Sequence, residues 1–191
     1  MKLINVSIRG DTSFLMHRFN EQEEVQNSTR KVLIKRGTPR EEAEKVCHID
    51  KDGRFFFPGI AIARLLREAG ANHKIKGSRR SAKFVVPAAV FVMQDEVLLR
   101  NGDGKSFAKD FEVDSRPVVI PATRGRIMRH RPRFDGWGAS FTLRINDDIL
   151  PPEFVHSLLT EGGVTIGLGD FRPQTSGPFG TFQVTEWKEA K

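Results

Sequence analysis

Cysteine is almost absent from this sequence, which has one, Cys47, among 191 residues. A single cysteine cannot form a disulfide within the chain, and its scarcity favours a reducing compartment. Long hydrophobic runs are also lacking, and the apolar stretch at the N-terminus is too short and interrupted for a signal peptide. We therefore expect a cytoplasmic protein that does not bind a membrane.

Clustered metal ligands are missing as well. The five histidines are scattered, and Cys47 beside His48 does not by itself form a structural zinc site. The stretch "HIDKDG" resembles a calcium loop, but His48 occupies the first ligand position and Gly59 the position of the closing glutamate. The pattern predicts a hairpin turn at Asp52 and Gly53, and it predicts no metal or other cofactor.

Common enzyme motifs fail on their spacing. "GDGKS" at 102–106 resembles the end of a P-loop, but Leu99 stands where the first glycine is required. Gly167 and Gly169 begin a dinucleotide-binding fingerprint, but Arg172 takes the place of its third glycine. The sequence thus favours a protein without catalytic activity, although a catalytic set assembled from distant residues would not be visible at this level.

Positive charge is what the chain has in excess, with 31 Lys and Arg against 24 Asp and Glu and a net charge of +7. This balance favours a polyanionic partner such as nucleic acid. Two short basic clusters stand out, the first Lys74, Lys76, Arg79, Arg80 and Lys83, and the second Arg124, Arg126, Arg129, Arg131 and Arg133. In a strand, Arg129, Arg131 and Arg133 would share one face at intervals of about 6.6 Å, as a row suited to phosphates. The alternative is a solvated edge strand protected by its charges.

Hydrophobic periodicity predicts the elements of the fold. Strands are expected over 2–9, 84–93, 164–168 and 181–187, with residues 124–134 and 136–146 as a paired set. Helices are expected over 39–46, with Thr38 as the N-cap, over 58–70, and over 152–159, where Gly162 and Gly163 end the helix. In the second helix, Ile62, Leu65, Leu66 and Ala69 form the core face, and Arg64 and Glu68 have the spacing of an exposed pair.

Without its insertions the predicted order is strand, helix, strand, strand, helix, strand. This is an α+β, ferredoxin-like pattern, also described as RRM-like or split βαβ. We expect one domain over 1–191, with insertions near 12–57 and 94–123 and a glycine-rich loop near the C-terminus. Because this fold hosts many functions, the site must decide between them.

The C-terminal loop is the most unusual stretch, because four glycines (Gly167, Gly169, Gly177 and Gly180) cluster where one strand is expected to end. Glycine lets a backbone lie close against a ligand. Our interpretation is that the loop amides approach a nucleic-acid backbone while Arg172 supplies charge. The alternative is a long structural hairpin in which Arg172 pairs with Asp170 or another neighbour.

Three stretches together resemble one family, the RAMP superfamily of CRISPR-associated proteins and especially its guide-RNA-binding backbone subunits. They are "NVSIRGDTSFLMH", "FFFPGIAIARLLREAG" and "GLGDFRPQTSGPFGTF", which resemble the family's first strand, its strand-to-helix segment and its C-terminal glycine-rich loop. The sequence departs from the family pattern at Ile60 and Ala61, where serines are usual, and at Ala63 and Arg64, where Lys and Gly are usual.

The resemblance implies a non-catalytic protein that binds single-stranded RNA or DNA and assembles as a homo-oligomer or as a subunit of a ribonucleoprotein complex. One alternative is a metal-independent ribonuclease of the same superfamily, with His17 or His48 as general base. Another is a virus-encoded inhibitor that uses the same basic face on a protein partner. The residues expected to bind nucleic acid are Lys74, Lys76, Arg79, Arg80, Lys83, Arg129, Arg131, Arg133, Gly167, Gly169, Arg172, Gly177 and Gly180.

Overall fold

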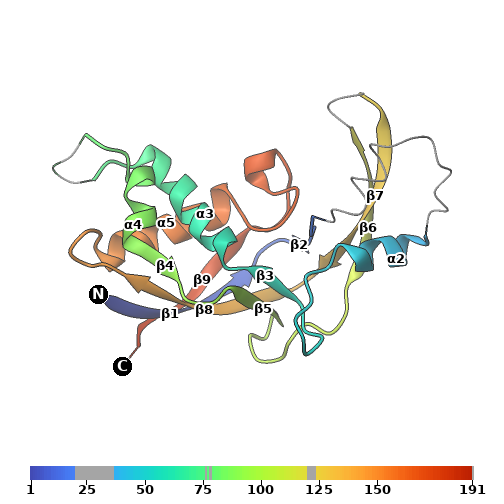
Figure 1. The fold of residues 1–191 in the computed structure, drawn as a ribbon, viewed down its shortest axis with the longest axis horizontal. Helices are drawn as coiled ribbons and strands as arrows, with labels where there is room; N and C mark the ends of the chain where they lie inside the picture. The colour runs from blue at the N-terminus through green and yellow to red at the C-terminus, as the bar shows by residue number, and fades with distance from the viewer. Residues whose placement is uncertain (20–36, 76, 78, 120–123, 191) are drawn as a thin grey trace.

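The computed structural model describes residues 1–19, 37–75, 77, 79–119 and 124–190 as an α+β fold with antiparallel sheets (Figure 1). The strands are β1 (Lys2–Gly10), β2 (Phe14–Leu15), β3 (Phe56–Pro58), β4 (Val90–Val92), β5 (Glu96–Asn101), β6 (Glu112–Val119), β7 (Arg126–Phe134), β8 (Trp137–Ile145) and β9 (Phe182–Glu189). The α-helices are α2 (Pro39–Lys45), α3 (Ile60–Ala69), α4 (Val86–Ala89) and α5 (Pro152–Thr165). Short 3-10 turns cover Gly70–Asn72, Ala82–Phe84 and Pro173–Thr175.

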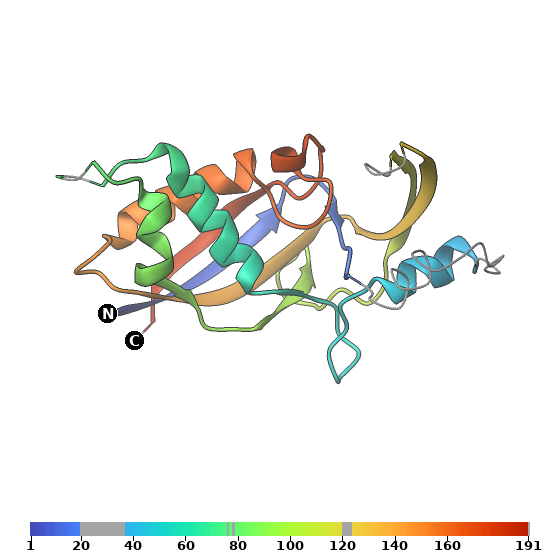
Figure 2. The same ribbon diagram turned by 45° about the horizontal axis from the view of Figure 1, so that its top comes forward.

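The main sheet has the order β3-β5-β8-β1-β9, and β4 pairs with β8 beside β5. Helices α3 and α5 lie over one face of this sheet (Figure 2). Strand β1 confirms the predicted alternation, because Ile4, Val6 and Ile8 are buried beneath the helices. On α3 the predicted core face is also confirmed, since Ile62, Leu65, Leu66 and Ala69 are all buried. The sheet and the two helices thus enclose the main apolar core.

Helix α5 does not end at its glycine pair, so the predicted helix end and the strand over 164–168 are wrong. Both glycines lie inside the helix, where neighbours leave no room for a side chain. A Cβ on Gly162 would lie 2.5 Å from Leu65 Cδ2, and one on Gly163 would lie 2.5 Å from the Phe182 carbonyl oxygen. Close packing of α5 against α3 and β9 therefore outweighs the cost of glycine within a helix, about 1 kcal/mol relative to Ala.

The apolar run over 84–93 is not one buried strand, as predicted, but a 3-10 turn, helix α4 and strand β4. Pro87 stands in the first turn of α4, where its missing N–H costs nothing. Strands β4 and β5 pair with successive parts of β8, and Gln94 fills the interruption between them. The Thr142 amide donates to Gln94 Oε1 at 2.8 Å, in place of a main-chain partner.

Strands β6 and β7 project from the body of the molecule as an arm (Figure 1). The prediction that β7 pairs with β8 is wrong, because β7 pairs with β6 and β2 in a separate three-stranded sheet. Strands β7 and β8 are joined by Asp135 and Gly136, and Gly136 has a φ of 56°. This left-handed turn directs the chain from the arm into the main sheet.

Two local predictions are confirmed at the base of the arm. Thr38 caps α2, and a capping box joins it to Glu41. The turn at Asp52 and Gly53 closes a hairpin, because Ile49 bridges Phe55 across it and Gly53 has a φ of 78°. Among the residues described, no helix is long and apolar enough to cross a membrane.

Candidate nucleic-acid groove

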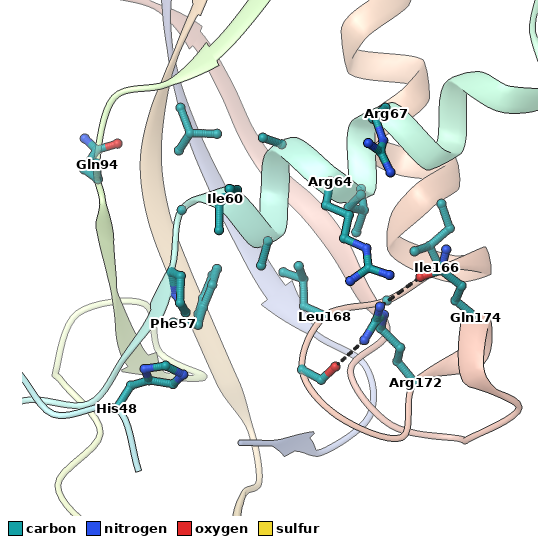
Figure 3. A pocket seen from close by; sticks show the side chains of 18 of the residues that line it. His48, Phe57, Ile60, Arg64, Arg67, Gln94, Ile166, Leu168, Arg172 and Gln174 are labelled. Atoms are coloured by element: carbon teal, nitrogen blue, oxygen red, sulfur yellow. Dashed lines mark hydrogen bonds between the residues drawn. The ribbon is translucent and has the colours of Figure 1, made fainter. Parts of the chain in front are cut away.

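A groove of about 930 Å³ lies between the first half of α3, the β4–β5 edge and the loop that follows α5 (Figure 3). The α3 wall contributes Ile60, Arg64 and Arg67, and the loop wall contributes Arg172 and Gln174. Phe14, Met16 and His17 also line it, so the groove joins all three stretches singled out in the sequence.

Two guanidinium groups point into the same end of the groove (Figure 3). Arg172 donates to the Gly169 carbonyl oxygen at 2.8 Å and to Gln174 Oε1 at 2.9 Å, so both of its acceptors are uncharged. Burial and the nearby charge of Arg64 lower the pKa of Arg172. Within the described residues no carboxylate forms an ion pair with either arginine. Two like charges held together without a counterion make this end of the groove suitable for an anion.

The predicted pair of Arg64 with Glu68 does not form. Glu68 instead accepts from Arg67 at 2.7 Å and from Lys83 at 3.2 Å. Arg64 is thereby left for the groove.

The glycines of the loop make close contacts within the protein, which accounts for them without a ligand; that the loop amides approach nucleic acid stays a prediction. A Cβ on Gly177 or Gly180 would lie 1.8 Å from the carbonyl oxygen of Phe171 or Leu168, respectively. A Cβ on Gly169 would lie 2.5 Å from the Leu15 carbonyl oxygen, and one on Gly167 would lie 3.0 Å from that of Gly180. The loop is thus folded tightly on itself and on β2, which fixes the position of Arg172.

Most main-chain amides of this loop already have acceptors inside the protein. Leu168 donates to Gly180, Asp170 to Leu15, and Gly180 to Ser13. Within the described part of residues 166–180, the amides left without an acceptor are those of Gly169 and Arg172, and both residues line the groove. Any main-chain donation to an anion would therefore come from these two amides.

The alternative in which Arg172 pairs with Asp170 or another neighbour is met in its second form only, because Arg172 bonds to Gly169 and Gln174 and not to Asp170. Asp170 Oδ2 accepts from Arg131 Nη1 of β7 at 2.8 Å. Burial raises the pKa of Asp170, but the hydrogen bond and charge of Arg131 outweigh it and hold that pKa below its usual range. The nearest acid in the sequence is thus engaged by Arg131 and not by Arg172.

The predicted row of arginines on β7 is largely neutralised. Arg131 is 3% exposed and also lies 3.5 Å from Asp114. Arg133 pairs with Glu112 and, at 3.1 Å, with Asp135. Arg129 is exposed and faces Arg116 across the strands. The three side chains do follow one another at alternate positions, but opposing acids on β6 occupy two of them. Whether the row contacts nucleic acid stays a prediction.

The first basic cluster lies beyond the C-terminal end of α3, whereas the groove lies at the helix start (Figure 1). Lys74 bridges Ser81 across the segment, Lys83 pairs with Glu68, and Arg79 is exposed. Arg80 makes an interaction of its own, and Lys76 lies outside the described residues. The structure therefore does not bring this cluster together with Arg172.

The other end of the groove holds two imidazoles, those of His17 and His48. Burial and the charges of Arg18 and His17 lower the pKa of His48, which favours its neutral form. No set of residues suited to a metal ion occurs in the described part of the chain. This end could therefore accept a proton, but it does not resemble a metal centre.

Sequence reasoning missed the α3 wall and the β4–β5 edge as parts of the site. Arg64 was assigned to a surface pair, and Phe91 and Gln94 carried no motif, although both line the groove. They share the groove with Arg172 only through the tertiary fold, so no local signal could have identified them.

No protein-family model matches the sequence, and neither does any curated protein. Among solved structures, a chain in the cryo-EM structure of the type III-B Cmr-beta bound to cognate target RNA aligns with the whole of this chain, at 13% identity and a TM-score of 0.57. This likeness shows a shared fold, and the present chain spans 61% of that chain's length. Cmr6 from Pyrococcus furiosus aligns over 95% of this chain and 97% of its own at 11% identity, with a TM-score of 0.41 that is too low to carry an argument.

Proposed function

We propose that this protein binds single-stranded nucleic acid, preferentially RNA, as a RAMP-like protein without catalytic activity. The observation that carries the proposal is the pair of guanidinium groups, Arg64 and Arg172, which share the groove without a carboxylate partner in the described residues. A phosphate between them would supply the missing counterion and accept charge-assisted hydrogen bonds from both. Apolar walls beside the arginines, at Ile60 and Phe91, offer surfaces for an unstacked base.

The fold supports the same proposal. In the main sheet, β4, β8, β1 and β9 are neighbours in that order, and α3 and α5 follow β1 and β8 in the chain. We interpret this as the ferredoxin-like arrangement of RAMP proteins. One structural neighbour with the same fold is a chain in the structure of a type III-B Cmr assembly bound to target RNA. The proposal therefore includes a place for this protein in a ribonucleoprotein complex of the CRISPR type.

The test measures, by fluorescence anisotropy, how tightly a labelled oligouridylate binds to the parent protein and to the Arg64→Ala and Arg172→Ala variants. Each substitution removes one charge-assisted contact, so each should weaken binding by about tenfold. Arg9→Ala is the matched control, because Arg9 is exposed, lies outside the groove and forms no ion pair within the described residues. The control should bind like the parent.

Failure of the parent protein to bind the oligonucleotide at any salt concentration would contradict the proposed function. Equal weakening by Arg9→Ala and Arg172→Ala would contradict the groove as the site, because it would mean that only net charge matters. An oligodeoxyuridylate of the same length tests the preference for RNA. The parent protein should bind it more weakly than the oligouridylate.

A second candidate function, metal-independent cleavage of RNA, is favoured by the imidazoles of His17 and His48 in the same groove. A neutral His48 could act as a general base on a ribose hydroxyl. Incubation of end-labelled RNA with the protein in excess chelator tests this activity. Discrete products from the parent and none from His48→Ala would establish cleavage, and intact RNA in both reactions would exclude it.

A further inference from the structure

Asp170 is the acid nearest to Arg172 in the sequence, and it also lines the groove. Burial and Arg64 lower the pKa of Arg172, while the charge of Asp170 raises it, so the two groups lie within electrostatic range. No ion pair joins them in the structure, because Asp170 pairs with Arg131 instead. An acid that is close to Arg172 is thus paired with Arg131 instead.

Arg131 is well placed for this task, because it reaches the loop from a different sheet. Its side chain is buried, and its guanidinium lies over the Phe171 ring, 5.9 Å from the centroid. Asp170 is fixed further by its own backbone, because its amide donates to Leu15 and its Oδ1 accepts from the Phe171 amide at 2.9 Å. The carboxylate therefore has one orientation, toward the arm.

We propose that Arg131 is a positioning residue for nucleic-acid binding, which sequesters the Asp170 carboxylate and so keeps Arg172 available to a phosphate in the groove. The inference rests on the proposed function of that groove. Arg131 itself does not touch the nucleic acid, since it is buried beneath the loop. This role also explains why an arginine is buried at the base of the arm. An apolar residue at that position would pack without the free-energy cost of removing two charges from water.

Loss of Arg131 would leave Asp170 without its ion-pair partner. Asp114, the second acid that pairs with Arg131, would still have one. Asp114 keeps an ion pair with Arg116 at 2.8 Å. Asp170 forms no ion pair with another lysine or arginine among the described residues; the charge of His17 also lowers its pKa, and Arg172 lies two positions away. An internal ion pair between Asp170 and Arg172 would then compete with phosphate for the same guanidinium.

The experiment measures binding of a fluorescently labelled oligouridylate as a function of salt. Arg131→Gln should weaken binding by about tenfold and lower the slope of log affinity against log salt by about 0.7, the value of one phosphate contact. The double variant Arg131→Gln/Asp170→Asn removes the freed acid and should bind within about twofold of the parent. A purely structural role would leave the double variant as weak as the single one, since both lack the ion pair.

Arg40→Gln is the matched control for a broken ion pair, because Arg40 pairs with Asp110 and Glu44 and none of the three lines the groove. It removes the same charge and should bind like the parent. Asp170→Asn alone keeps Arg131 paired with Asp114, so it should fold and bind at least as tightly as the parent; this variant carries the test if Arg131→Gln does not fold.

Weak binding by the double variant, or by Asp170→Asn, would overturn the inference. So would parental binding by a folded Arg131→Gln. Absence of binding by the parent protein would instead reject the function proposed for the groove, which keeps the two failures distinct.

Discussion

The arm has more arginines than the groove, but three of them are engaged by carboxylates. On β6 and β7, Arg116, Arg131 and Arg133 each face a carboxylate at ion-pair distance. In the groove, Arg64 and Arg172 face each other and uncharged acceptors. Positive charge in a sequence therefore says little about where an anion binds; the decisive quantity is the number of cations whose neighbours are not acidic.

The two regions also differ in how their backbones are held. The arm is a regular antiparallel pair that any alternating sequence can form, whereas the glycine-rich loop tolerates no side chain at its closest contacts. The loop that positions Arg172 is therefore more tightly packed than the arm. Substitutions in the loop should have larger effects on stability than substitutions in the arm.

The largest expected effect follows from Gly177→Val. The new Cβ would overlap the Phe171 carbonyl oxygen, so the loop would have to open, at a cost of about 3 kcal/mol. Thermal melting should show a midpoint lower by about 10 °C. Ser176→Gly is the control in the same loop, because Ser176 has a φ of 62° and glycine relieves that strain. A Gly177→Val variant as stable as the parent would show that the loop is not tightly packed.

A smaller effect concerns acid stability. The pKa of Asp170 is lower in the folded protein than its ordinary value of about 3.9, so the group stabilises the fold above that pH, and the contribution is lost as the pH falls through the folded value. Asp170→Asn should therefore flatten the dependence of the unfolding free energy on pH below about 4. Asp110→Asn is the comparison from the α2 side, where the carboxylate is exposed and screened. Equal flattening in both would remove the distinction between them.

The smallest effect separates paired from unpaired arginines on the arm. Arg133→Gln breaks ion pairs with Glu112 and Asp135 and should cost about 0.5 kcal/mol. Arg129→Gln breaks none within the described residues and should leave stability unchanged. Urea titration of both variants measures the difference, and a larger loss for Arg129→Gln would contradict the ion-pair pattern on this strand.

Local signals in the sequence predicted several elements well. The alternation in 2–9, the cap at Thr38 and the core face of α3 follow from short-range rules that the fold obeys. The glycine pair in α5 could not be read in the same way, because its purpose is contact with Leu65 and Phe182, which are distant in the sequence. A glycine pair that ends a helix and a glycine pair that allows close packing within a helix look the same in the sequence.

The candidate site was predicted in part, for a similar reason. Arg172 and its loop were identified from the clustered glycines, but the loop's role was inferred without the neighbours that fill its space. The ion pair of Arg131 with Asp170 joins residues 39 positions apart and depends on which sheet β7 enters. Since the predicted pairing of β7 with β8 was wrong, the true partners of its arginines could not be foreseen.

The central claim, that the groove and not the arm supplies the main phosphate contacts, is tested most directly by the salt dependence of RNA binding in two double variants. Arg64→Gln/Arg172→Gln and Arg126→Gln/Arg129→Gln each remove two charges, and none of the four arginines has an ion-pair partner among the described residues. The groove variant should lower the slope of log affinity against log salt by about 1.4, and the arm variant by less than about 0.7. A larger loss of slope in the arm variant than in the groove variant would contradict the account.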